Sequence, residues 1–286
     1  MTTQAPAQGA GALRNNMRSL PLLLLASLLV LGQPARANVV IAGTRVIYPA
    51  DKQEVTLQLS NVGDQPALVQ AWINDDENSR SPNDSEAPFV IMPPIARIGP
   101  GKSQMLRIAY TGEETSDKQE SVYWLNVLDI PPRPGDIGAK NYMQISIRSQ
   151  IKLLFRPANL PGSADAAAEQ LEWSLVADAG KAALKVANPS RYHVSLSAVD
   201  LEGGAKPISV GGGMVGPGQE LELPLNASVP PGQKTTVRYV WINDYGAAVS
   251  GKKGSEQEYR PIEILTRLPL LPNVLTLSEP FMSTRP

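Results

Sequence analysis

The sequence predicts an all-β protein with two immunoglobulin-like β-sandwich domains, joined by a short hinge and with a cleft between them. Of its 286 residues, 23 are Gly and 26 are Pro, which is too much turn-forming sequence for a helical bundle. Apolar and polar residues alternate with a period of two along most of the chain, as they do in half-buried strands. The same succession of short strands and turns begins again after Pro161-Gly162, which indicates a second domain.

The first 37 residues predict a secretory signal peptide. Arg14 and Arg18 precede an apolar run over residues 20–31, and Ala35-Arg36-Ala37 follows it, the order typical of a cleaved leader. The run is shorter than the ~20 residues that a membrane-spanning helix needs. We expect cleavage before Asn38, with Met17 as an alternative start of the chain.

The chain that remains after cleavage of the predicted signal peptide is mildly acidic. Removing residues 1–37 takes away three arginines and no acid, so the formal net charge changes from −1 to −4. A chain without a basic excess is not drawn to nucleic acid or to an anionic membrane surface. We therefore expect neither nucleic acid nor membrane insertion among its interactions.

The first domain is predicted over residues 38–157. Val55, Leu57 and Leu59 alternate with polar residues before a turn at 61–64, and later strands stop at Pro93-Pro94 and Pro131-Pro132. The spacing of these turns is typical of an immunoglobulin-like sandwich. The expected strands are 55–59, 67–73, 89–92, 106–110, 122–130 and 141–155.

The second domain is predicted over residues 158–286. Gly99-Pro-Gly-Lys and Gly216-Pro-Gly-Gln, each before a strand, indicate a weak internal repeat of the sandwich. A short helical segment is expected over 164–171, and the tail 267–286 is apolar in places and has no assignment. The expected strands are 171–176, 182–187, 194–199, 220–225, 235–242 and 261–268.

Catalytic and metal chemistry finds little support in the residues. The chain has no Cys and a single His, His193, which excludes a disulfide framework, a thiol nucleophile and a site built on several histidines. A hydrolase centred on His193 is an alternative, but no nucleophile motif accompanies this histidine. The acids Asp75, Asp76 and Glu77 lack the spacing of a calcium loop. We predict no enzymatic activity, no cofactor and no metal.

Two glycine-rich stretches match nucleotide-binding patterns by chance. Residues 211–216 fit G-x-G-x-x-G, but Pro217 follows and no strand–helix unit surrounds them. Residues 246–252 approach a P-loop, but Lys253 stands where a Ser or Thr is needed. Both stretches are interpreted as polar loops.

The long strand over 141–155 is the most informative feature. At about 15 residues it exceeds the usual strand of ~5–6, and Met143, Ile145, Ile147 and Ile151 alternate with polar residues along it. One interpretation is a core strand whose apolar side faces inward, and the pattern alone favours it. The other is a strand at a sheet edge that pairs with a strand of another protein.

Three stretches of the chain resemble the periplasmic pilus-assembly chaperones of the chaperone–usher pathway. They are residues 43–49 (GTRVIYP), 123–132 (YWLNVLDIPP) and 150–157 (QIKLLFRP), with weaker likeness at 188–189 and 242–247. The resemblance therefore extends in order over most of the exported chain. The linker 133–140 is short and no disulfide can form, which points to the short-loop branch of that family.

The resemblance implies a binding role for the last strand of the first domain. Pilus subunits of this pathway lack their final strand, and Met143, Ile145, Ile147 and Ile151 would fill the exposed groove of a subunit. Arg45 and Lys152 match the cations that hold the C-terminal carboxylate of the subunit, where charge-assisted hydrogen bonds form. Glu120, Arg156 and Asp244 match an inter-domain ionic cluster expected to set the hinge angle.

The predicted function is therefore that of a periplasmic chaperone without catalytic turnover. It would cap pilus subunits (pilins) by donor-strand complementation and deliver them to an outer-membrane usher, and the free protein could cap itself as a dimer. The alternative is a secreted structural or adhesive module built from tandem immunoglobulin-like domains. Such a module would need neither Arg45 nor Lys152.

Overall fold

The computed structural model describes residues 38–112, 118–133, 143–178, 181–204, 206–226 and 234–259. The chain divides into two compact units: one holds the residues up to Leu160 together with Asp244–Gly246, and the other holds Pro161–Asn243 and the residues from Ala247 onward. The predicted signal peptide 1–37, the linker residues 134–140, the strand 261–268 and the tail 267–286 lie outside the described residues. None of the helices in the described ranges is long and apolar enough to cross a membrane.

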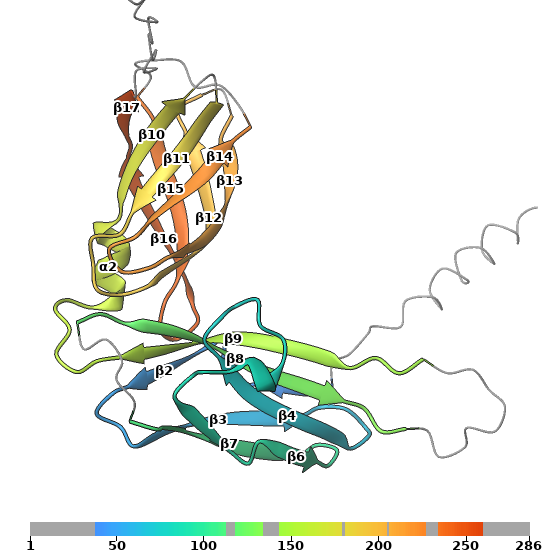
Figure 1. The fold of residues 1–286 in the computed structure, drawn as a ribbon. Coiled ribbons are helices and arrows are strands. Elements are labelled where there is room, and N and C mark those ends of the chain that lie inside the picture. Colours follow the sequence, from blue (N-terminus) through green and yellow to red (C-terminus); the bar gives the residue numbers. More distant parts are fainter. Residues whose placement is uncertain are drawn as a thin grey trace, which may run out of the picture. The chain divides into compact units, whose positions relative to one another are not determined.

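The first unit is a sandwich of two β-sheets (Figure 1). Only the pairing of β2 with β9 is parallel among the strand pairs of this unit in the described residues. One sheet has the order β1 (Val39–Ile41), β3 (Glu54–Asn61), β7 (Ser103–Tyr110), β5 (Phe89–Met92). The other has the order β2 (Arg45–Pro49), β9 (Ile147–Arg156), β8 (Ser121–Ile130), β4 (Ala67–Asn74), β6 (Ile95–Ile98).

The core of the first unit lies between these sheets and comes from alternate positions of the strands, as period-two patterning requires. Leu59, Ile108, Leu125 and Leu153 are fully buried there. The Tyr48 hydroxyl accepts a hydrogen bond from the backbone N–H of Tyr110 at 3.0 Å and donates to the carbonyl of Gln53 at 2.9 Å. A buried tyrosine thus keeps its polar end satisfied while its ring packs in the core.

The second unit is also built from two sheets, joined to a short helix α2 (Ala164–Gln170). Ser163 caps the helix, its side chain accepting a hydrogen bond from the N–H of Ala166 at 3.2 Å. The Tyr239 ring packs against the rings of Trp173 and Trp241 in tilted geometry, with centroid distances of 5.2 and 5.6 Å. The sheet orders are β14 (Glu220–Leu225), β11 (Lys181–Ala187), β10 (Glu172–Asp178), β17 (Glu256–Tyr259), and β13 (Ile208–Val215), β12 (Val194–Glu202), β15 (Thr236–Ile242), β16 (Ala248–Gly254).

The interpretation of the two glycine-rich stretches as polar loops is wrong, because each contributes to a strand, β13 and β16. A side chain at Gly212 would place its Cβ 2.4 Å from the carbonyl oxygen of Leu196 on the neighbouring strand. A Cβ at Gly251 would lie 2.5 Å from the ring of Tyr239. These glycines therefore mark close approach within a sheet rather than a turn. The prediction of an all-β fold with two sandwiches is confirmed.

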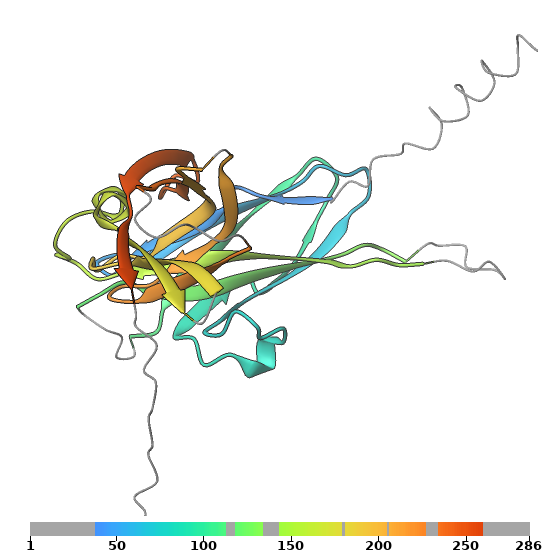
Figure 2. The ribbon, with the colours of Figure 1, turned by 90° about the horizontal axis from the view of Figure 1, so that it is seen from above.

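The long strand is shorter than predicted. β9 begins at Ile147, residues 143–146 are described but carry no strand pairing, and residues 141–142 lie outside the described ranges. Figure 1 and Figure 2 both show β8 and β9 running side by side to the end of the unit from which residues 143–146 extend.

Candidate functional site

Arg45 and Lys152 are neighbours in the first unit. The parallel pairing of β2 with β9 begins at this pair, in which Arg45 lies directly opposite Lys152. Paired residues of adjacent strands project to the same face of a sheet. The Lys152 Nζ also lies 5.7 Å from the centroid of the Trp124 ring on β8, a cation–π distance. The sheet thus places two cations side by side, one of them over an aromatic face.

Both cations are partly buried, and this changes their electrostatics. Burial lowers the pKa of Arg45, while the charges of Asp244 and Glu120 oppose that change. Burial also lowers the pKa of Lys152, and the charge of Arg45 lowers it further. Two partly desolvated like charges raise each other's energy, so an anion that bridged them would relieve both the repulsion and the lost hydration.

Glu120, Arg156 and Asp244 lie together within the first unit, whereas the resemblance implies a cluster between the two domains. Arg156 donates through Nε to Glu120 Oε1 at 2.9 Å, and through its two terminal nitrogens to Asp244 Oδ2 at 2.7 Å and Oδ1 at 3.0 Å. Burial lowers the pKa of Arg156, but the hydrogen bonds and charges of Asp244 and Glu120 outweigh it and raise the pKa overall. Asp244 belongs to the turn assigned to the first unit, and a role in setting a hinge angle stays a prediction.

The predicted groove-filling residues fall into two groups. Met143, Ile145 and Ile147 are 85%, 64% and 41% exposed, and we call them the exposed row. Ile151 instead packs against the buried core of the first unit, next to Leu125 in the register of β8 with β9. Its side chain is therefore already committed to this chain's own core, which sets it apart from the other three.

The exposed row continues the apolar side of β9 in the N-terminal direction, beyond the point at which β2 begins to pair with it. β8 pairs with β9 from Ile147 to Phe155, whereas β2 pairs with it only from Lys152 onward. Within the described part of the chain, residues 147–151 thus have a hydrogen-bonded neighbour on one side only. Such an edge offers unpaired backbone groups together with apolar side chains.

The polar side of this edge is held by the segment between β4 and β5. Arg148 donates to the carbonyl of Ser79 at 3.1 Å and to Asn126 Oδ1 at 3.3 Å, and Gln150 donates to the carbonyl of Glu77 at 3.1 Å. Asn126 in turn donates to Asn74 Oδ1 at 2.9 Å, and both asparagines are fully buried. The sequence offers two signals for this network: Asn126 lies within the predicted strand 122–130, and Asn74 directly follows the predicted strand 67–73.

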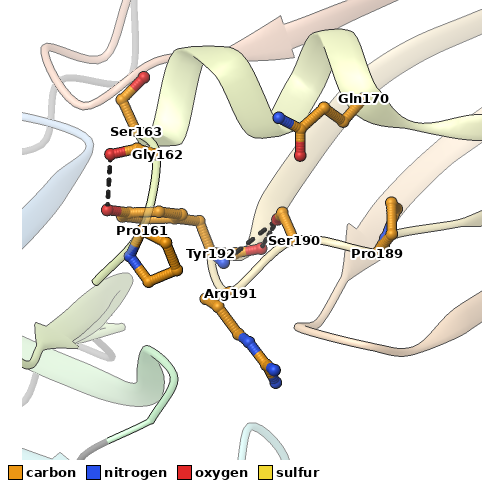
Figure 3. Close-up of a pocket in the computed structure, with 8 residues that line it drawn as sticks. All are labelled: Pro161, Gly162, Ser163, Gln170, Pro189, Ser190, Arg191 and Tyr192. Atoms are coloured by element: carbon orange, nitrogen blue, oxygen red, sulfur yellow. Dashed lines mark hydrogen bonds between the residues drawn. The ribbon is translucent and has the colours of Figure 1, made fainter.

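The described residues contain no group of three or more His, Cys, Asp or Glu that could hold a metal ion. A hollow of about 220 Å³ lies in the second unit beside α2 (Figure 3). The Tyr192 hydroxyl on its wall donates to the carbonyl of Gly162 at 3.1 Å, and Ser190 donates to the carbonyl of Tyr192 at 3.2 Å. These polar groups thus bond to one another.

Two family models match the chain. Residues 38–161 match the "Pili and flagellar-assembly chaperone, PapD N-terminal domain". Residues 166–253 match the "Pili assembly chaperone PapD, C-terminal domain".

Curated proteins and solved structures that are similar to this chain also carry the names of chaperones. The probable fimbrial chaperone YadV of Escherichia coli K12 is 35% identical over 75% of this chain and 89% of its own length. The chaperone protein MrkB of Klebsiella pneumoniae is 38% identical over 75% of this chain and 90% of its own. The crystal structure of the YadV chaperone aligns with a TM-score of 0.66 at 33% identity, over 76% of this chain and all (100%) of that one. The SafA pilin–SafB chaperone complex of Salmonella enterica contributes a match with a TM-score of 0.63 at 30% identity, over 78% of this chain and 97% of that one.

Proposed function

The chain belongs to the family of pili assembly chaperones with PapD N- and C-terminal domains, and on that premise we propose that it caps pilus subunits in the periplasm by donor-strand complementation. It acts stoichiometrically, without catalytic turnover, and passes the subunit to an outer-membrane usher. Subunits are the expected partner because a solved relative, SafB, is a chaperone in complex with the pilin SafA.

The observation that carries the proposal is the exposed row beside the edge half of β9. An incomplete sandwich lacking one strand exposes both unpaired backbone groups and an apolar groove. Strand addition satisfies both, since the backbone supplies hydrogen bonds while alternate side chains enter the groove. Full burial of a Met or Ile side chain contributes roughly 1.5–3 kcal/mol. The exposed row of three therefore contributes several kcal/mol to capture.

Arg45 and Lys152 supply the second part of the proposal, which is register. A strand that slips by one residue turns all its apolar side chains to the wrong face. A subunit's C-terminal carboxylate held between the two cations would fix where the added strand starts. Ile147, the member of the exposed row nearest the anchor, lies five residues before Lys152 on the same strand β9, and Ile145 and Met143 precede it along the chain.

Co-expression with a pilus subunit tests the proposal directly. Ile145→Asp places a charge in the row that would enter the groove, and it should abolish recovery of a one-to-one complex. Met105→Asp is the matched control, because Met105 is also exposed, at 46%, but lies on the other sheet; it should leave recovery unchanged. Both free proteins should unfold at the wild-type urea midpoint. Normal recovery with Ile145→Asp would refute donor-strand capture by this edge.

A further inference from the structure

Asp129 is a buried acid that the proposed function does not use. It lies on β8 between Val69 of β4 and Ile147 of β9, and it is only 7% exposed. Its Oδ1 atom has no hydrogen-bond partner among the described residues. An ionised carboxylate that leaves water without a full set of donors is strongly disfavoured. The buried Oδ1 atom of Asp129 therefore needs a hydrogen-bond donor.

The groups that face this carboxylate come from the start of β1. Burial raises the pKa of Asp129, and hydrogen bonds from the backbone N–H groups of Val39 and Asn38 counter that effect without offsetting it. Two peptide N–H groups thus point at the acid, yet they leave Oδ1 unsatisfied. The two donors to the Asp129 carboxylate are neutral peptide groups, so they bring no positive charge to balance it.

Asn38 is held in place by contacts of its own. The N–H of Val62 donates to the carbonyl of Asn38 at 2.7 Å. A Cβ at Gly63 would lie 2.5 Å from Asn38 Oδ1, so only glycine leaves room for this side chain. The next residue, Val39, pairs with Asn61 at the first position of β1. The nitrogen of Asn38 is therefore fixed near Asp129 by the fold.

The sequence places the predicted signal-peptide cleavage at this same nitrogen. Hydrolysis of the bond between residues 37 and 38 adds the hydroxyl of water to the Ala37 carbonyl carbon and a hydrogen to the Asn38 nitrogen. The new amine takes up a proton from solvent, because an α-amino group has a pKa of about 7.7–8.0. One peptide N–H thereby becomes an ammonium group with three donors and a unit charge.

We infer that cleavage before Asn38 creates an α-ammonium that pairs with Asp129 and supplies the donor that Oδ1 lacks. Processing thus completes a latch between the first strand of the mature chain and β8. Asp129 lies directly opposite Ile147, so the latch secures the end of the sheet that bears the exposed row. The inference depends on the cleavage position and not on subunit capture, so either can fail without the other.

The exported protein tests the latch through the reactivity of its terminal amine. Its intact mass should correspond to a chain that begins at Asn38. Acylation of the α-amine near neutral pH should be about tenfold slower than in Asp129→Asn, since each pKa unit gained by an ion-paired ammonium removes nine-tenths of the reactive free amine. Asp64→Asn, an exposed acid in the nearby turn, is the control and should react at the wild-type rate.

A second variant keeps the test decisive if Asp129→Asn does not fold. Two alanines inserted directly before Asn38, with cleavage before them confirmed by mass, move the ammonium away from Asp129. This chain should be acylated about tenfold faster than wild type, and its urea midpoint should be lower. A mature chain that begins elsewhere, or equal acylation rates in all these proteins, would overturn the inference.

Discussion

The two halves of β9 have the same alternation of residues but opposite environments. In the second half, Leu153 and Phe155 are 0% and 3% exposed, and the strand is hydrogen-bonded to both β2 and β8. In the first half, Ile147 is 41% exposed, and β8 is its neighbour on one side. The change occurs where β2 begins, at Arg45 opposite Lys152. The fully buried apolar residues thus belong to the half that is paired on both sides, and Ile151, directly before the boundary, also contacts the core.

Paired truncations should separate the two halves most strongly. Leu153→Ala removes a buried side chain and leaves a cavity, so the free energy of unfolding should fall by about 2–5 kcal/mol. Ile145→Ala removes an exposed side chain in the segment that leads into the first half, and it should change the free energy of unfolding by less than about 0.5 kcal/mol. Urea unfolding of both purified proteins measures the contrast. Similar losses in the two variants would show that the exposed row is packed like the second half of β9.

The alternation of residues predicts the environment of the second half of β9 better than that of the first half. Alternation predicts a strand through residue 155, and the burial of Leu153 follows from it. The same alternation continues through Met143, so from the pattern alone an inward-facing strand was favoured, and the exposure of the row was expected only from the family resemblance. What separates the halves is the point at which β2 starts to pair, about a hundred residues away along the chain, and local patterning does not encode such a contact.

The candidate site shows the same limit. Likeness to family motifs predicts the five site residues, and the structure brings all of them into one unit: Arg45, Lys152, Glu120, Arg156 and Asp244. The loop carbonyls that hold Arg148 and Gln150 were missed, because a backbone acceptor leaves no mark in the sequence. Ile151 was grouped with the exposed row because it shares its parity, whereas its position beside Leu125 places it on the core.

Charge removal at the boundary between the halves should weaken capture and spare the fold. Arg45→Ala and Lys152→Ala each delete a hydrogen-bonding cation, and hydrogen bonds to charged groups contribute about 1.5–3 kcal/mol. The Kd for a pilus subunit should therefore rise by roughly ten- to a hundredfold. Lys102→Ala, at an exposed lysine on the other sheet's side of the unit, is the control. Titration calorimetry with a subunit whose C-terminal carboxylate is amidated should show no further loss on either substitution.

The loop contact should have a smaller effect, confined to the first half. Arg148→Ala removes the hydrogen bonds to Ser79 and Asn126, which tie the first half of the strand to its neighbours. Amide hydrogen exchange over residues 147–150 should accelerate, while exchange over residues 153–155 should not change. Equal acceleration in both halves would mean that Arg148 stabilises the whole strand.

The smallest expected effect is a pH dependence centred on Lys152, and its sign differs between folding and binding. Burial and the charge of Arg45 lower the pKa of Lys152 in the free protein, so the folded state binds its proton less tightly than the unfolded chain does. The free energy of unfolding should then rise as pH increases through the lowered pKa toward the ordinary value of about 10.4. A bound carboxylate restores the pKa, so capture takes up a proton and the affinity should fall over the same range. Lys152→Arg keeps its charge throughout and should flatten both profiles; profiles that persist in this variant would assign the effect to another group.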